Sequence, residues 1–344
     1  MNKMSSAIIA MSGGVDSSVA AAICKEKYRK VIGCTLKLFE AESTDIAIND
    51  AAEVCKKLGI DHIVVDSKDI FKKYVIDYFI NSYKHGETPS PCVMCNPNVK
   101  FFMLEKIRKD IGFCKMVTGH YAILENRDDL VYLKKAKDQM KDQSYFLYRI
   151  PNDILRNAEF PLGEFQSKLE VRRIAESLGL ETSCKKDSQD ICFIKNCKYT
   201  ELINSAIQGN IIDELDGKIL AKHNGIENYT IGQRKGLGLS GGPFYVKKID
   251  ADTNSVIVSK ELDYKNTIFL DDVVWVNNEI LGACSTKLRS SKPQRNAIIN
   301  KTQDGNYFVT LNEADIGVAP GQHCVFYDNE YVIGGGVIKD SIMV

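Results

Sequence analysis

A short loop rich in glycine and hydroxyl groups, residues 12–17 (SGGVDS), constrains this chain most strongly. It follows an apolar run at residues 7–11 that is typical of a buried strand, and it precedes a helical pattern over residues 17–28. Two adjacent glycines allow a tight turn that brings backbone N–H groups close to an anion. A helix start adds unpaired N–H donors and the positive end of a dipole. The loop therefore predicts a phosphate site between a strand and a helix.

Strand and helix patterns alternate through the first half of the chain. Helical patterns occur at residues 45–58, 68–83, 99–111, 142–150 and 166–178, and apolar strand patterns occur at residues 31–38, 62–65 and 116–118. Such alternation is typical of βαβ units. The fold class we expect is α/β, with a doubly wound parallel sheet in the N-terminal domain.

The pattern changes after about residue 197. Glycines cluster, and short β-type runs follow at residues 243–246, 255–258, 272–276, 297–299, 307–311, 323–327 and 331–333. Short, regularly spaced runs with turns between them favour all-β modules, such as small barrels. We expect an α/β domain at residues 1–197, a central mainly-β domain at 198–265 and a C-terminal β-barrel at 266–344.

Charge and cysteine content limit the class of protein. The chain has 45 basic and 45 acidic residues, and this balance excludes nucleic-acid binding by bulk positive charge but allows a local basic face. The sequence has no apolar stretch near the ~18 residues of a membrane helix and no signal-peptide pattern, so we expect no membrane partner. Eleven cysteines without a secretory signal indicate a reducing cytoplasm.

The loop chemistry indicates a nucleotide. No Gly-Lys-Ser/Thr follows, so this is not a Walker loop, and Asp16 could hold Mg²⁺ on bound phosphates. The simpler alternative is a capped strand-to-helix turn. The full hexapeptide, placed after the first strand, resembles that of the PP-loop pyrophosphatases, which cleave ATP to AMP and pyrophosphate and usually adenylate an oxygen.

Three cysteines are candidates for chemistry. Cys92 and Cys95 form a CxxC pair shortly before a helical pattern, where a helix dipole would favour the thiolate, and Cys192 follows Lys185 and Lys186. They could act as a redox or persulfide pair, as ligands of an iron–sulfur site, or as buried apolar residues. Four further cysteines lie in apolar patterns and are assigned to the core: Cys24, Cys34, Cys55 and Cys114.

One basic run lies in the C-terminal β region. Lys287, Arg289, Lys292, Arg295 and Lys301 occur with no acidic residue between residues 285 and 302. Such a run suits contact with a phosphate backbone, and the alternative is a solvated lysine-rich face.

Seven separated motifs, in one order, resemble those of the tRNA-specific 2-thiouridylases (the MnmA family). They are AMSGGVDSS (residues 10–18), CNxxVKF (95–101), TGHYA (118–122), KDQSYFLYRI (141–150), DSQDICFI (187–194), YTIGQRKGLGLSGGPFYV (229–246) and PGQHCVFYD (320–328). The resemblance runs from about residue 7 to about residue 338, so it covers nearly the whole chain.

The resemblance implies a cytoplasmic enzyme that thiolates the wobble uridine of tRNAs for Lys, Glu and Gln. ATP with Mg²⁺ adenylates the 2-oxygen of uracil. A donor such as a cysteine desulfurase or a sulfur relay protein supplies a persulfide sulfur to one cysteine. That sulfur displaces AMP, the second cysteine resolves the intermediate, and a disulfide bond is among the implied features. The first domain would bind ATP and carry out catalysis, and the central domain would contact tRNA.

Residue roles carry over from the matching motifs. Cys95 would be the nucleophile and Cys192 would carry the persulfide, with Asp16 as a further catalytic residue. The implied ATP-binding residues are Ala10, Met11, Ser12, Gly13, Gly14, Val15, Asp16, Ser17, Leu36 and Gly119. The implied tRNA-binding residues are Ser90, Pro91, Cys92, His120, Lys141, Asp142, Gln143, Arg289, Ser290 and Gln322.

Three positions depart from the family pattern. Many members have Asp where this chain has Cys92, Tyr where it has Ser290 and Met where it has Leu36. A third cysteine beside Cys95 and Cys192 leaves open a [4Fe–4S] cluster with one open iron. The alternatives are therefore another PP-loop enzyme, an iron–sulfur-dependent tRNA thiolase, or a non-catalytic RNA-binding redox protein.

Overall fold

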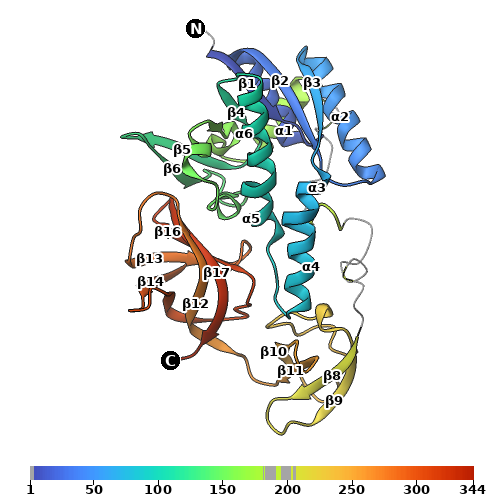
Figure 1. Cartoon of the computed structure of the whole chain (residues 1–344), viewed down its shortest axis with the longest axis vertical. Helices are drawn as coiled ribbons and strands as arrows, with labels where there is room; N and C mark the ends of the chain where they lie inside the picture. The colour runs from blue at the N-terminus through green and yellow to red at the C-terminus, as the bar shows by residue number, and fades with distance from the viewer. Residues whose placement is uncertain (1–3, 181, 183–190, 195–202, 204–206) are drawn as a thin grey trace.

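The computed structural model describes residues 4–180, 182, 191–194, 203 and 207–344. Three β-sheets dominate the chain, and two long helical segments run between the N-terminal sheet and the other two (Figure 1). Lys185, Lys186, Cys184 and Cys197 lie outside the described residues. No helix in the described part of the chain is long and apolar enough to cross a membrane.

The N-terminal sheet is parallel and has five strands in the order β3-β2-β1-β4-β7, as predicted for a doubly wound fold. Side chains alternate along β1, so Ala7 and Ile9 enter one core and Ile8 enters the other. Each face therefore has its own apolar cover. The strands are β1 (Met4–Ala10), β2 (Tyr28–Lys37), β3 (Asp61–Asp66), β4 (Lys115–Val117) and β7 (Ala158–Glu159), and the larger helices around them include α1 (Val15–Lys27), α2 (Glu42–Leu58) and α8 (Lys168–Ser177).

Two helical segments extend from this domain. The first is α3 (Lys68–Phe71), a π-type turn η1 (Lys72–Ile76) and α4 (Asp77–Lys84). The second is α5 (Pro91–Cys95), a π-type turn η2 (Asn96–Phe101) and α6 (Phe102–Asp110). The prediction that the second helix starts near residue 99 is wrong, because Pro91 occupies the first turn, where its missing N–H costs nothing.

The helix predicted at residues 142–150 is also wrong. Only η3 (Ser144–Phe146) is helical there. The Asp142 carboxylate accepts hydrogen bonds from the backbone N–H of Ala136 (3.0 Å), the backbone N–H of Ser144 (3.2 Å) and the Ser144 hydroxyl (2.8 Å). These local bonds offer the backbone an alternative to a helix. Short elements nearby are α7 (Asn152–Leu155) and η4 (Pro161–Glu164).

The central β part is a four-stranded sheet in the order β10-β11-β8-β9. Its strands are β8 (Gln208–Asp213), β9 (Ile219–Asn224), β10 (Tyr245–Asp250) and β11 (Ser255–Ser259), with a short turn η6 (Ile226–Asn228). The first two strands were not predicted.

The C-terminal part is a closed six-stranded barrel, as predicted. Its strands follow the order β12-β15-β14-β13-β16-β17, and β12 also pairs with β17. A hairpin from the N-terminal half, β5 (Ala122–Arg127) and β6 (Leu130–Lys135), extends this sheet through β6 and β17. The sequence did not predict this hairpin. The barrel strands are β12 (Tyr264–Trp275), β13 (Gly282–Lys287), β14 (Arg295–Lys301), β15 (Tyr307–Ile316), β16 (His323–Asp328) and β17 (Tyr331–Ile342).

The basic run of the barrel is not an unpaired cationic face. Lys292 pairs with Asp315 (2.9 Å), and Lys301 pairs with Glu279 (2.8 Å). Arg295 lies 3.7 Å from both Glu313 and Asp315. Acidic residues outside the run therefore oppose three of its five members: Asp315 and Glu313 lie on β15, the neighbour of β14, and Glu279 lies shortly before β13.

Candidate functional site

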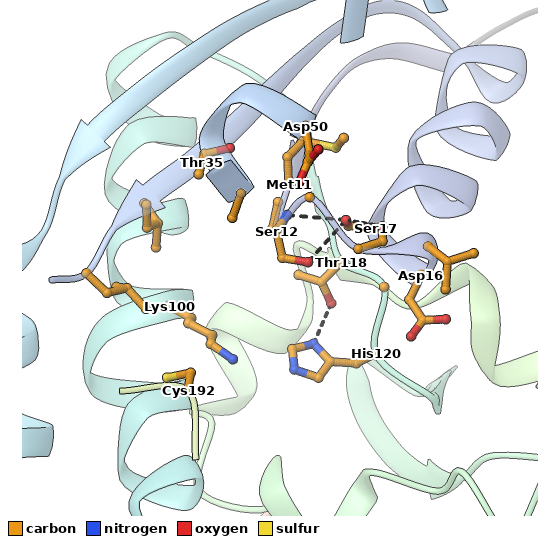
Figure 2. Close-up of a pocket in the computed structure, with 18 of the residues that line it drawn as sticks. Met11, Ser12, Asp16, Ser17, Thr35, Asp50, Lys100, Thr118, His120 and Cys192 are labelled. Atoms are coloured by element: carbon orange, nitrogen blue, oxygen red, sulfur yellow. Dashed lines mark hydrogen bonds between the residues drawn. The ribbon is translucent and has the colours of Figure 1, made fainter. Parts of the chain in front are cut away.

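A cavity of about 890 Å³ opens at the carboxyl ends of β1, β2 and β4 (Figure 2). The strand order reverses between β1 and β4, and open α/β sheets bind ligands at such a switch point. All the predicted ATP-binding residues line this one cavity: Ala10, Met11, Ser12, Gly13, Gly14, Val15, Asp16, Ser17, Leu36 and Gly119.

The loop before α1 is tightly packed on both sides. Gly13 has φ +68°, and a Cβ there would lie 2.5 Å from the Ala47 carbonyl oxygen of α2. A Cβ at Gly119 would lie 2.9 Å from the Ser17 backbone nitrogen. Within the loop, the Ser17 hydroxyl donates to the Gly14 carbonyl (3.0 Å) and accepts from the Ser12 backbone N–H (3.2 Å). This packing holds the start of α1 open toward the cavity, as an anion site requires.

Asp16 is fixed by two partners that the sequence did not reveal. The Tyr121 hydroxyl donates to Asp16 Oδ1 (2.7 Å), and the Lys168 ammonium forms an ion pair with the same oxygen. Lys168 Nζ also lies 5.4 Å from the centroid of the Tyr121 ring. The second oxygen, Oδ2, has no hydrogen bond to the described residues. One carboxylate oxygen beside a phosphate site fits Mg²⁺, which prefers oxygen ligands and keeps several waters.

His120 forms an apolar wall of the cavity. Its ring lies 5.8 Å from the Phe101 ring and 6.0 Å from the Phe160 ring, and Nδ1 lies 2.8 Å from the Thr118 hydroxyl. Burial, together with the nearby Lys100 ammonium, lowers the pKa of His120 to about 3. The imidazole is therefore neutral at physiological pH in this state of the protein.

The Lys141-Asp142-Gln143 segment lines the same cavity. Gln143 Oε1 accepts a hydrogen bond from the Tyr121 backbone N–H (2.9 Å), next to the contact of Tyr121 with Asp16. Because the Asp142 carboxylate is engaged in its own loop, Asp142 shapes the cavity wall in this state of the protein.

The structure gathers the candidate cysteines around one cation. Cys192 is exposed and lines the cavity, Cys92 is exposed, and Cys95 is 5% exposed. Lys100 interacts electrostatically with all three, and Figure 2 shows it beside Cys192. The signal for Lys100 was present in the CNxxVKF motif. In the π-type turn η2, hydrogen bonds join residues five positions apart. Lys100, which is five positions after Cys95, therefore lies about one helical turn beyond it.

The prediction of a helix-favoured thiolate at Cys95 is wrong. Cys95 is the last residue of α5 and packs among Phe71, Val75 and Val99. Burial raises the pKa of its thiol to about 12, although Lys100 acts in the opposite direction. Cys24, Cys34 and Cys55 are buried as predicted, whereas Cys114 is exposed.

The burial of Cys95 predicts a difference in alkylation. At pH 8 iodoacetamide should modify Cys92 and Cys192 at least about 100-fold faster than Cys95, because a thiol with a pKa near 12 has a thiolate fraction of roughly 10⁻⁴. The Cys95 rate should then rise about tenfold per pH unit from pH 7 to 10. Mass spectrometry of peptides after timed quenching measures all three rates, and equal rates at pH 8 would contradict the assignment.

Several expected tRNA contacts lie outside the cavity. Ser90 and Pro91 are buried, and Ser290 is exposed. Arg289 is partly buried near Tyr145 and Tyr83. Burial lowers the pKa of its guanidinium, whereas the two tyrosines raise it. Gln322 donates to the carbonyl oxygens of Thr88 (2.8 Å) and Pro89 (3.3 Å). These contacts with tRNA stay predictions.

Among the described residues, no group of three or more His, Cys, Asp or Glu side chains is arranged to hold a metal ion. The three cysteines near Lys100 therefore do not form a ligand cluster in this arrangement.

Comparisons with known proteins cover almost the whole chain. Three families match in succession: the tRNA methyl transferase HUP domain at residues 5–196, the tRNA methyl transferase PRC-barrel domain at 199–260 and the aminomethyltransferase beta-barrel domain at 265–338. The tRNA-specific 2-thiouridylase MnmA of Rickettsia akari is 42% identical over 360 residues, covering 99% of this chain and 98% of that protein.

Other relatives agree. The tRNA-specific 2-thiouridylase MnmA of Bradyrhizobium sp. (strain BTAi1) is 41% identical over 363 residues, covering 97% of this chain and 91% of that protein. Among solved structures, the U34-tRNA thiolase NcsA from Methanococcus maripaludis with its [4Fe-4S] cluster has 19% identity and a TM-score of 0.37, covering 60% of this chain and 66% of that one. That likeness is too slight to bear on function.

Proposed function

This chain belongs to the tRNA-specific 2-thiouridylase family, and from that premise we propose that it is a tRNA-uridine 2-sulfurtransferase that uses ATP to thiolate the wobble uridine of tRNAs for Lys, Glu and Gln. The observation that carries the proposal is a single cavity. The phosphate loop at residues 12–17 and Cys192, which come from distant parts of the sequence, line the same space.

The first half-reaction activates the base. Oxygen O2 of uracil attacks the α-phosphorus of ATP, the α–β bond breaks with its electron pair on pyrophosphate, and N3 of uracil loses its proton. Backbone N–H groups at the start of α1 bind the phosphates. Asp16 would hold Mg²⁺ there, and the bound ion would supply positive charge for the departing pyrophosphate. Lys168 and Tyr121 keep the Asp16 carboxylate in place.

The second half-reaction transfers sulfur. The terminal sulfur of a Cys192 persulfide attacks C2 of uracil, and AMP leaves with the C2–O2 bonding pair. The Cys95 thiolate then attacks the Cys192 sulfur, which leaves the transferred sulfur on C2 and forms a Cys95–Cys192 disulfide. A thiol reductant restores both thiols. The positive charge of Lys100 favours the anionic forms of these sulfurs. At Cys95, burial acts in the opposite direction and favours the neutral thiol.

The partners and the finer assignments are also proposals. We propose that the persulfide comes from a cysteine desulfurase or a sulfur relay protein, for which the exposed Cys192 is accessible. We place the protein in the cytoplasm, where its tRNA substrate is found. We keep the domain boundaries near residues 197 and 265, which fall close to the limits of the three family matches.

A [4Fe–4S] cluster on Cys92, Cys95 and Cys192 is the second candidate. It is favoured only by the cysteine at position 92, where many family members have aspartate. Iron and sulfide analysis of anaerobically purified protein distinguishes the two: about four irons per chain would support the cluster, and iron-free protein that makes 2-thiouridine would support the persulfide route.

The proposed function is tested with unmodified glutamate tRNA, ATP-Mg and a persulfide donor. Retardation on a mercury gel should show 2-thiouridine, and pyrophosphate release should depend on tRNA. A tRNA with cytidine at position 34 is the matched control and should give neither product. Pyrophosphate release that is unaffected by the U34 replacement would contradict modification of the wobble uridine.

A further inference from the structure

The helix that carries Cys92 and Cys95 begins beside the two C-terminal β-sheet regions. Residues 86–90 lead from α4 into α5 and pack against both C-terminal parts of the chain. A Cβ at Gly86 would lie 2.9 Å from Ile249 Cγ2, in the central sheet region. A Cβ at Gly321, in the barrel, would lie 2.9 Å from Glu87 Cβ. Both C-terminal parts of the chain therefore closely contact the approach to the cysteine helix.

Three hydrogen bonds join this segment to one barrel loop. The Thr88 backbone N–H donates to the Pro320 carbonyl oxygen (2.8 Å). The Gln322 amide Nε2 donates to the carbonyl oxygens of Thr88 (2.8 Å) and Pro89 (3.3 Å). Gln322 thus binds two successive carbonyl groups directly before Ser90 and Pro91.

Little freedom remains between this contact and Cys95. Pro89 and Pro91 each have a fixed φ, so residues 89–91 form a stiff connection. Ser90 and Pro91 are buried, and α5 starts at Pro91. At the other end of α5, the Asn96 amide donates to the Phe146 carbonyl oxygen (2.8 Å). The barrel loop therefore holds the chain directly before α5, and the Asn96 hydrogen bond holds the chain directly after it.

We propose that Gln322 is a positioning residue for sulfur transfer, because it holds the start of α5 and so places Cys95 relative to Cys192. This inference rests on the proposed function. Attack of one sulfur on another requires reacting atoms in near contact, and a displacement of about 1 Å can cost roughly 100-fold in rate. The amide nitrogen of Gln322 is committed to these two carbonyl groups, so a tRNA contact that keeps both bonds would use only the amide oxygen.

Hydrogen exchange in the absence of tRNA tests the placement directly. In Gln322→Leu, backbone amides of residues 88–95 should exchange at least about tenfold faster than in the wild type, because both carbonyl contacts are lost. Gln322→Glu, which keeps the size but removes the donor, should behave in the same way. Gln303→Leu, at an exposed turn of the same barrel, is the matched control and should leave these amides unchanged.

Steady-state thiolation separates positioning from tRNA contact. Gln322→Leu should lower kcat about tenfold or more, beyond any change in the tRNA Kd, with the Kd for ATP within twofold of wild type. Unchanged exchange at residues 88–95, or a loss that resides entirely in the tRNA Kd, would overturn the role of Gln322. Failure of the wild type to form 2-thiouridine would instead overturn the proposed function, since hydrogen exchange is measured without the reaction.

Discussion

Replacing Cys192 by serine should abolish 2-thiouridine formation and leave the first turnover of tRNA-dependent pyrophosphate release close to the wild-type rate. The hydroxyl cannot carry a persulfide, while the phosphate loop and Asp16 are untouched. Residues that act as one catalytic unit cost roughly 10³-fold or more when removed, so thiolation should fall below about 0.1% of wild type. Mercury-gel retardation and a pyrophosphate assay on the same reactions measure the two half-reactions separately.

Two further serine variants sharpen this result. Cys95→Ser should also stop multiple turnover and retain adenylation, because only the resolving attack is lost. Cys92→Ser separates the persulfide route from the cluster, since Cys92 is exposed, interacts with the same Lys100, and leaves a hydroxyl of similar size for any contact with tRNA. It should keep at least about half of the wild-type rate. Loss of thiolation in Cys92→Ser, equal to that in Cys192→Ser, would contradict the persulfide route and favour the cluster.

Alanine at position 13 should reduce ATP affinity at least about 100-fold. Two costs combine there, because Gly13 has φ +68° and its new Cβ would lie 2.5 Å from the Ala47 carbonyl oxygen. The backbone must move, and the N–H groups that bind phosphate move with it. Equilibrium binding of labelled ATP without tRNA measures the loss directly.

Gly112→Ala separates the two costs at position 13. Gly112 has φ +67°, almost the same value, but its Cβ would meet no atom within 4 Å. This control should lose only about 1–2 kcal/mol of unfolding free energy to backbone strain and should keep normal ATP affinity. If both variants bind ATP as the wild type does, the loop at residues 12–17 is not the phosphate site.

Local sequence patterns determined much of the fold. The strand–loop–helix unit at residues 7–28 predicted the first parallel unit, and spaced β-type runs predicted the closed barrel. These predictions succeeded because glycine turns, apolar strands and helix starts depend on neighbouring residues. The ATP-binding residues named from the family motifs all line one cavity for the same reason, since most belong to a single turn.

Contacts between distant segments decided what the sequence patterns missed. The hairpin β5–β6 gains stability as part of the barrel sheet through β17. The basic run appears unopposed in sequence, but the barrel brings Asp315 and Glu313 beside it.

The sequence by itself determined the chemistry that this protein carries: a phosphate loop, a CxxC pair and a third cysteine far along the chain. Only the tertiary structure decided how that chemistry is tuned and placed. It buries Cys95 and raises its pKa to about 12, sets Lys100 against the sulfurs and engages Gln322 before α5. The physical reason is that pKa values and hydrogen-bond partners depend on which groups exclude water from one another, and folding brings those groups together from remote parts of the chain.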